Sequence, residues 1–266
     1  MQRWQLRQSN IYNRINVRLM RVIATIFLVL IIPIITICGD WIADLMTVRV
    51  ASGLNYFAIS LGVSLWFLWL GLKIAEKCKD RFAHTSNVAL IGVSVVAFMG
   101  YVAIDLVGRF DLFMRLSDYL GSYLSGMVVY RFPMLLYGVV FMVLGVLLHG
   151  KDVGLSGRKG WVYGGISLAL YLACCVGAEL VYYGLDDLHV GYALIHAVSA
   201  FPLLAIGLII YGLTYSKEYT GKVADFLAYL CPSAIFIYVL KLYSSPILVL
   251  LYLVGMWFVY RKFARK

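Results

Sequence analysis

The chain has 266 residues, of which 63% are hydrophobic and only 14% are charged, and its formal net charge is +10. A soluble globular domain carries about 25% charged residues, so this composition excludes an ordinary water-soluble domain and indicates a lipid bilayer as the solvent. The positive charge does not indicate a nucleic-acid partner, because no basic stripe is interleaved with exposed aromatic residues; short loops that face anionic membrane lipids account for it.

A transmembrane helix needs about 20 consecutive apolar residues. Eight charge-poor runs of about this length follow one another, and they predict spans at about 22–39, 50–72, 86–104, 132–150, 160–178, 188–215, 226–240 and 242–260. The expected fold is therefore all-α: a polytopic integral membrane bundle of about eight transmembrane helices that forms a single domain over residues 1–266. Only Lys241 separates the last two runs, which are either a tight hairpin or one broken helix.

The first run follows five arginines, as the apolar region of a signal peptide would. It is longer than such a region, and Cys38-Gly39-Asp40 follows it in place of a small-residue cleavage site. We interpret it as a retained signal-anchor helix.

Orientation follows from the distribution of Lys and Arg over alternate loops. With the amino terminus inside, 18 of the 23 basic residues lie on the inner side and five on the outer side. Eight of the 13 acidic residues lie outside. The pattern predicts that both termini are cytoplasmic, and the short inner loops favour a bacterial inner (plasma) membrane.

One predicted outer segment, residues 109–127, has the pattern of an amphipathic helix. Its apolar residues share one stripe, while three charged residues lie on the other side: Phe113, Leu116, Leu120, Tyr123 and Met127 against Asp111, Arg115 and Asp118. Such a helix lies flat at the membrane surface. It either covers the bundle or roofs a substrate cleft.

Ionisable groups inside a membrane are costly and usually functional. His196 is the clearest case, because it lies about 12 Å inward from the start of its span. It is either a hydrogen-bonded core histidine or a general base. Arg131, Glu179 and Asp105 all end spans on the outer side, where they either snorkel to the interface or converge into a polar vestibule that binds substrate.

The inner loop from Gly154 to Gly160 is glycine-rich and basic, and it is either a flexible connector or a phosphate-binding loop. It does not match a Walker A motif. Five cysteines without a CxxC pair or zinc spacing indicate neither a disulfide framework nor a metal site.

Three stretches resemble the membrane-bound acyltransferase-3 family. Asn16 to Ile31 is similar to that family's opening helix, in which Arg21 and Ala24 match its Arg and Ala. Tyr130 to Gly145 is similar to its R-x-x-x-F-x-x-G helix, and Phe226 to Leu248 resembles its late helix pair. The positions of the family's two histidines carry Ile32 and Lys241, and Arg18 stands where the family has Asp.

The resemblance implies O-acetyl transfer from acetyl-CoA to cell-envelope sugars, a polysaccharide or a lipid-linked glycan. The donor's phosphates would face the inner basic residues Arg21, Arg158 and Lys159. Because Ile32 and His196 lie at similar predicted depths, the protein is either an enzyme whose base has moved to His196 or a non-catalytic relative that binds glycan. The alternative from another class is a small transporter or a membrane subunit of an envelope-glycan assembly. The sequence leaves the oligomeric state open.

Overall fold

A computed structural model describes residues 18–78, 87–107, 109–151, 153–155, 158–184, 189–214 and 221–263. These residues are 93% helical and include no strand, which confirms the predicted all-α fold. Eight helices in this part of the chain are long and apolar enough to cross a membrane, as in a multi-pass membrane protein.

The first span covers Arg18–Ile37 and ends in η1 (Ile26–Ile31) and α2 (Ile32–Ile37). The other elements follow in chain order: α3 (Gly39–Leu45), α4 (Val48–Lys77), α6 (Asn87–Val107), α7 (Arg109–Gly126), η2 (Met127–Arg131), α8 (Phe132–Leu148), α9 (Arg158–Gly184), α10 (His189–Thr214), α11 (Lys222–Val239), η3 (Leu242–Ser244) and α12 (Pro246–Phe263).

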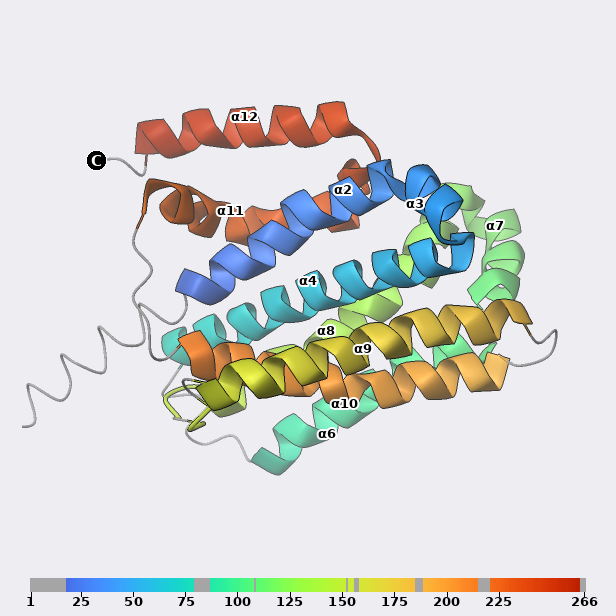
Figure 1. Ribbon diagram of the computed structural model, residues 1–266, viewed down its shortest axis with the longest axis horizontal. Helices are drawn as coiled ribbons and strands as arrows, with labels where there is room; N and C mark the ends of the chain where they lie inside the picture. Colours follow the sequence, from blue (N-terminus) through green and yellow to red (C-terminus); the bar gives the residue numbers. More distant parts are fainter. Residues whose placement is uncertain are drawn as a thin grey trace, which may run out of the picture.

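Figure 1 shows the spans side by side, with α3, α7 and the start of α10 at one end of the bundle. We call this end the α7 end. The opposite end, which we call the terminal end, carries the start of the first span and the end of α12 (Figure 1). An even number of spans places the first and last described residues on the same side. The Lys and Arg distribution predicts that this side is cytoplasmic.

Two prolines explain the two π-helical segments. Pro33 and Pro133 each lie two residues beyond a π-helix, η1 and η2. A proline ring clashes with the carbonyl four residues earlier and has no N–H, so the preceding turn widens. Accordingly, the N–H of Ile32 bonds the carbonyl of Phe27, and that of Phe132 bonds the carbonyl of Met127, both five residues back.

Helix α4 is the centre of the bundle, with 30 residues and a mostly buried middle. It packs against the first span on one side and against α8 and α9 on another. At the crossing with α8 the backbones touch, since a Cβ at Gly71 would overlap the carbonyl oxygen of Met142 and a Cβ at Gly145 would overlap that of Leu68. Only glycine permits this approach.

Helix α7 differs from the continuous helix that the pattern predicts. Gly121 has φ 74° and ψ 157°, a conformation that breaks the helix and that side chains other than glycine rarely adopt. The chain turns back there, and the Phe113 ring lies 5.8 Å from the Tyr130 ring. The fourth span consequently begins at Leu124, ahead of the predicted residue 132.

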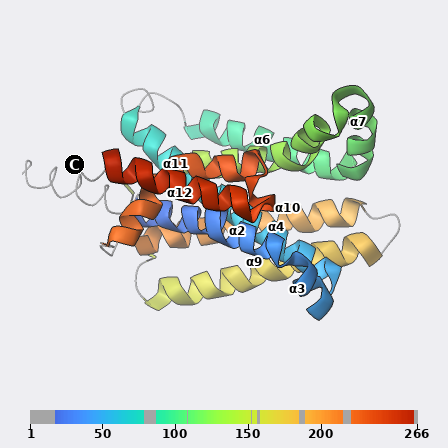
Figure 2. The same ribbon diagram turned by 90° about the horizontal axis from the view of Figure 1, so that it is seen from above.

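The last two runs form two helices, which answers the question that Lys241 left open. Lys241 adopts a left-handed conformation (φ 55°), and η3 follows it. Figure 2 shows α11 and α12 side by side. The Ser233 and Tyr252 hydroxyls bond at 2.8 Å across the pair. Because only Val249 of α12 is buried, this helix lies at the edge of the bundle.

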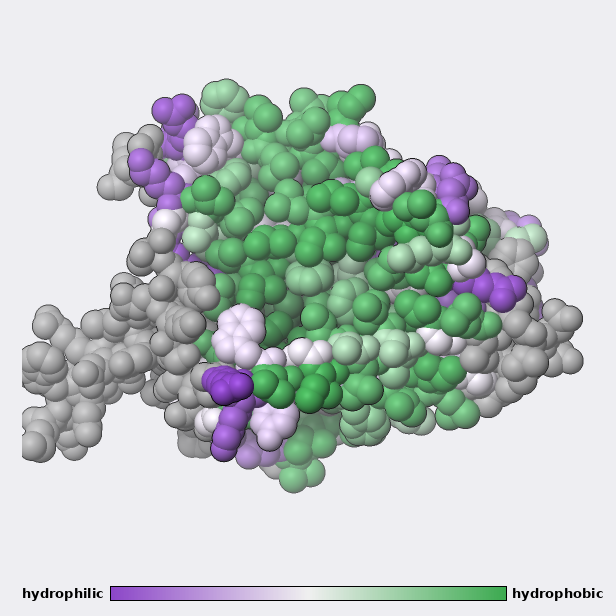
Figure 3. All heavy atoms as spheres, in the orientation of Figure 1, coloured by the Kyte–Doolittle hydropathy of each residue, from purple (hydrophilic) through white to green (hydrophobic). Residues whose placement is uncertain are grey.

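Hydrophobic residues cover the middle of the face drawn in Figure 3, and hydrophilic residues gather at its two ends. Exposed apolar side chains of this kind include Leu250, Leu251, Val254 and Phe258 on α12. A water-filled environment would penalise such a surface, whereas lipid would not. The surface agrees with a bundle that crosses a bilayer.

Candidate functional site

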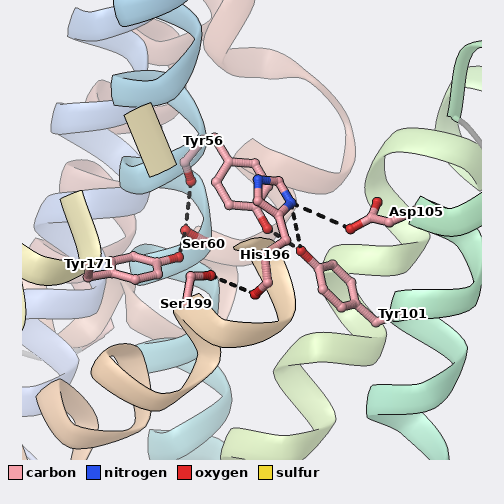
Figure 4. A network of polar contacts seen from close by, with 7 residues as sticks. All are labelled: Tyr56, Ser60, Tyr101, Asp105, Tyr171, His196 and Ser199. Atoms are coloured by element: carbon pink, nitrogen blue, oxygen red, sulfur yellow. Dashed lines mark hydrogen bonds and ion pairs between the residues drawn. The ribbon is translucent and has the colours of Figure 1, made fainter. Parts of the chain in front are cut away.

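His196 lies in a closed polar cluster between α4, α6 and α10. Its side chain is 0% exposed. Figure 4 shows its ring pointing toward Asp105 and Tyr101 on α6 and lying against Tyr56 on α4. The Tyr56 ring stacks on it at 4.2 Å, and the Tyr192 ring lies 4.1 Å away. The histidine is therefore held on both faces by aromatic rings.

The polar contacts of His196 converge on one ring nitrogen. Nδ1 lies 3.5 Å from Oδ2 of Asp105 and 3.2 Å from the Tyr101 hydroxyl. Both partners are buried, Asp105 at 2% and Tyr101 at 0% exposure. A charge or dipole here interacts more strongly than in water, because the surroundings have a low dielectric constant.

A second group of hydroxyls lies farther into the bundle. The Tyr101 hydroxyl bonds that of Tyr56. One turn along α4, the Ser60 hydroxyl bonds that of Tyr171 on α9 at 2.5 Å (Figure 4). Ser60 Oγ also donates to the Tyr56 carbonyl at 2.7 Å. The cluster therefore joins four helices, α4, α6, α9 and α10, through hydrogen bonds of these side chains.

Three of the four helices supply their members at a spacing of four residues, which places them on one face. The pairs are Tyr101 with Asp105, Tyr56 with Ser60, and Tyr192 with His196. Sequence reasoning identified His196 and Asp105 but not the tyrosines, because tyrosine is common at membrane interfaces and does not by itself indicate a site. The repeated spacing of polar residues on otherwise apolar helices is the signal that could have found them.

The two ring nitrogens have different surroundings. When Nδ1 carries its proton toward the Asp105 carboxylate, Nε2 of the neutral imidazole carries none and is the basic atom. This is the arrangement in which a carboxylate orients a histidine for general-base chemistry. The contact of 3.5 Å is longer than an N–H···O hydrogen bond and would tighten as positive charge develops on the ring.

The other two residues of the predicted vestibule have different surroundings. Glu179 is buried on α9, one turn from Cys175. Arg131 donates from Nη1 to the carbonyl of Val239 at 3.0 Å and bonds the Tyr243 hydroxyl. Burial raises the pKa of Tyr243, and the neighbouring guanidinium opposes that rise. Of the three, Asp105 is the residue that the structure brings to His196, whereas the described contacts of Arg131 tie α8 to the α11–α12 turn.

Ile32, which occupies the family's histidine position, is fully buried on the other side of α4. A Cβ at Gly62 would meet Leu28 of the first span, and Ala58 shares this face of α4. Since the first span runs antiparallel to α4, Ile32 is level with Ala58. Tyr56, which stacks on His196, is about 200° away around the helix. Ile32 and His196 thus lie at similar depths but on opposite faces of α4.

The three predicted donor-binding residues lie at the terminal end. Arg158 and Lys159 are exposed in the first turn of α9. The Tyr211 hydroxyl donates to the carbonyls of Leu148 and Lys151 at 2.7 and 2.9 Å, which joins α10 to the end of α8. Arg21 is half-buried and lies over the ring of Trp69, at 5.6 Å from its centroid.

Among the described residues, no group of three or more His, Cys, Asp or Glu side chains could hold a metal ion. No protein-family model, no curated protein and no solved structure matches this chain. The inference of function therefore depends on the cluster around His196 and on the resemblance found in the sequence.

Proposed function

We propose that this chain is an integral membrane enzyme of the O-acyltransferase type, with His196 as its general base. The observation that supports it is the pairing of a buried histidine with Asp105 through Nδ1, which leaves Nε2 as the basic atom. An intramembrane ionisable pair is costly, and function is the usual reason for one.

The reaction needs one base. A sugar hydroxyl oxygen attacks the acyl carbonyl carbon of the donor thioester while its proton passes to Nε2 of His196. The carbon–sulfur bond breaks, and the proton leaves with the thiol, so an ester and a thiol are the products. Asp105 stabilises the transient imidazolium, and Tyr101 positions the ring through its hydrogen bond at 3.2 Å.

Acetyl-CoA is the donor that the resemblance implies, and an envelope polysaccharide or a lipid-linked sugar is the acceptor. Arg158 and Lys159 are exposed at the terminal end, where the donor's phosphates would meet them. A bacterial inner membrane is the location that fits both substrates. In this arrangement donor and acceptor reach His196 from opposite ends of the bundle.

The second candidate is a non-enzymatic role, as a small transporter or a membrane subunit of an envelope-glycan assembly. The complete burial of His196 favours it, because the described helices leave no exposed atom of the residue for a substrate to reach. An enzyme with this cluster must open between α6 and α10, or at the α7 end, during turnover.

Two measurements test the proposal. On the detergent-purified protein, calorimetry should detect saturable acetyl-CoA binding, weakened when Arg158 and Lys159 are both changed to Gln. Membranes given acetyl-CoA labelled in the acetyl group should transfer label to a glycan or lipid-linked fraction, and His196→Gln should reduce the transfer by about 10² or more. Tyr163→Phe, on the exposed face of α9, is the matched control. Loss of fold in His196→Gln, or no binding at millimolar donor, would contradict the enzyme.

A further inference from the structure

Arg21 lies in a second polar environment, on the face of α4 opposite His196. Its guanidinium carbon is 5.6 Å from the Trp69 ring centroid, and the side chain also bonds the Cys231 thiol of α11. Its Nε is buried and has no hydrogen-bond partner among the described residues. Trp69 is 6% exposed, and its indole N–H likewise has no partner in the described chain.

No carboxylate balances this guanidinium in the described part of the chain. Asp225 and Glu76, two acidic residues of the described helices at this end, are already paired, with Arg18 and Lys73 respectively. Residues 1–17, which precede the first span, contain neither Asp nor Glu. Among the described residues, the Arg21 cation is therefore half-buried without a carboxylate of its own.

A half-buried cation without a counter-charge has lost solvation that an aromatic ring and a thiol restore only in part, so an anion at this position would stabilise the protein. The available donors define the anion. A guanidinium forks onto two oxygens of a phosphate, and an indole N–H can donate to a third. A phosphate monoester or diester has the oxygens to accept all of these bonds.

The depth of the site favours a lipid as the source of the phosphate. Arg21 is three residues, about 4.5 Å, from Arg18 at the edge of the first span. That distance places the guanidinium at the level where lipid headgroups meet the hydrocarbon core. The predicted orientation puts this edge in the cytoplasmic leaflet, where anionic lipids concentrate.

We propose that Arg21 and Trp69, between the first span, α4 and α11, form a binding site for a phosphate group, occupied in the membrane by the headgroup of an anionic phospholipid. The site is separate from the His196 cluster and does not depend on acyl transfer. A bound lipid would brace the first span against α4 and α11 at the terminal end, in addition to the Arg18–Asp225 salt bridge and the bond from the Trp66 indole N–H to the Cys231 carbonyl.

The test measures phospholipid binding to the full-length, delipidated protein in detergent by native mass spectrometry. Phosphatidylglycerol should bind one molecule per chain more tightly than phosphatidylcholine, which carries no net charge. Arg21→Gln should weaken this binding at least about tenfold, since it removes a charge-assisted fork. Trp69→Phe keeps the ring but loses the N–H, and a smaller loss is expected. Arg261→Gln removes the same charge from an exposed position in the last turn of α12, at the same end, and should have no effect.

Inorganic phosphate and coenzyme A, added in separate titrations, distinguish a soluble source from a lipid. Displacement of phosphatidylglycerol by either at low concentration, with dependence on Arg21, would assign the phosphate site to a soluble ligand and overturn the lipid. Equal losses in Arg21→Gln and Arg261→Gln would reduce the binding to general charge attraction and overturn the site. Arg21→Lys, which keeps the charge without the fork, guards against misfolding and should retain partial binding. Full binding by Arg21→Gln would also contradict the proposal.

Discussion

The polar groups on the two faces of α4 differ in their burial and in their partners. On the face toward α6, α9 and α10, the cluster of His196, Asp105 and Tyr101 is sealed from solvent, and its members bond one another. On the face toward the first span and α11, Arg21 is half-buried and pairs with an aromatic ring and a thiol. The first face contains a counter-charge for its histidine, whereas on the second face no carboxylate of the described residues pairs with Arg21.

We call Asp105 and His196 the built-in pair, because both partners belong to the fold. Arg21 has no such partner among the described residues. A buried histidine beside a carboxylate has its counter-charge within the fold, so no external ligand is needed to supply one. An arginine without a carboxylate is completed only by a ligand. A base at His196 also cannot act at the position of Ile32, since the body of α4 lies between the two residues.

The largest expected effect comes from a substitution in α4, the helix that lies between the two polar regions. Gly71→Val would force α8 away from α4, because the new Cβ overlaps the Met142 carbonyl oxygen and backbone cannot yield as a side chain can. We expect a loss of several kcal/mol, enough to abolish the folded monodisperse protein. Size-exclusion chromatography of the detergent-solubilised variant measures this.

Gly92→Val is the control for that substitution. It lies in α6, where a Cβ would meet nothing within 4 Å. We expect it to run as the unchanged protein does. A monodisperse, thermally stable Gly71→Val variant would show that the close α4–α8 crossing is not needed for folding. The description of α4 as the helix that separates the two polar regions would then be wrong.

The second prediction measures the built-in pair. A double-mutant cycle of Asp105→Leu and His196→Leu should give a coupling energy of about 1–2 kcal/mol, the upper part of the range for polar pairs in membrane proteins. Each single variant leaves one buried polar group without its partner, whereas the double variant leaves neither. Unfolding of the four proteins by SDS in mixed micelles supplies the free energies.

Asp118→Leu provides the matched control cycle with His196→Leu. Asp118 is exposed on α7 and has no described contact with the histidine. Distant sites add independently, so this coupling should be close to zero. Equal coupling in the two cycles would show that the Asp105 contact has no energetic weight.

The sequence predicts most of the fold because a bilayer imposes a simple length rule. Runs such as 160–178 and 226–240 stand out by their lack of charge alone. The break in α7 was not predicted, since a single glycine such as Gly121 is tolerated within a helical pattern and only its backbone angles show the turn. The π-helical segments before Pro33 and Pro133 were not predicted either, because the sequence shows the prolines but not how the preceding turn adapts to them.

The candidate site was predicted residue by residue but not as a group. His196 and Asp105 attract attention because charge inside a membrane is rare. Which helix faces α10 cannot be read from hydrophobic periodicity, because spans surrounded by lipid and by other spans are apolar on every side. Tyr56 and Tyr101 therefore came from the structure, and so did the separation of Ile32 from His196 by α4.

The smallest expected effect concerns the ion pair next to the Arg21 site. Arg18 and Asp225 form a salt bridge with side chains 33% and 38% exposed, so water and ions screen it. A cycle of Arg18→Gln and Asp225→Asn should give a coupling energy of about 0.5 kcal/mol or less, and raising the salt concentration should lower it further. Unfolding in the same micelles at two salt concentrations provides the comparison with the Asp105–His196 cycle. A coupling as large as that of the buried pair, or one that does not respond to salt, would mean that the first-span face also carries a built-in pair. The negative charge of Asp225 would then interact strongly with cations on this face and could also compensate Arg21. The proposal of an external phosphate would lose its main support.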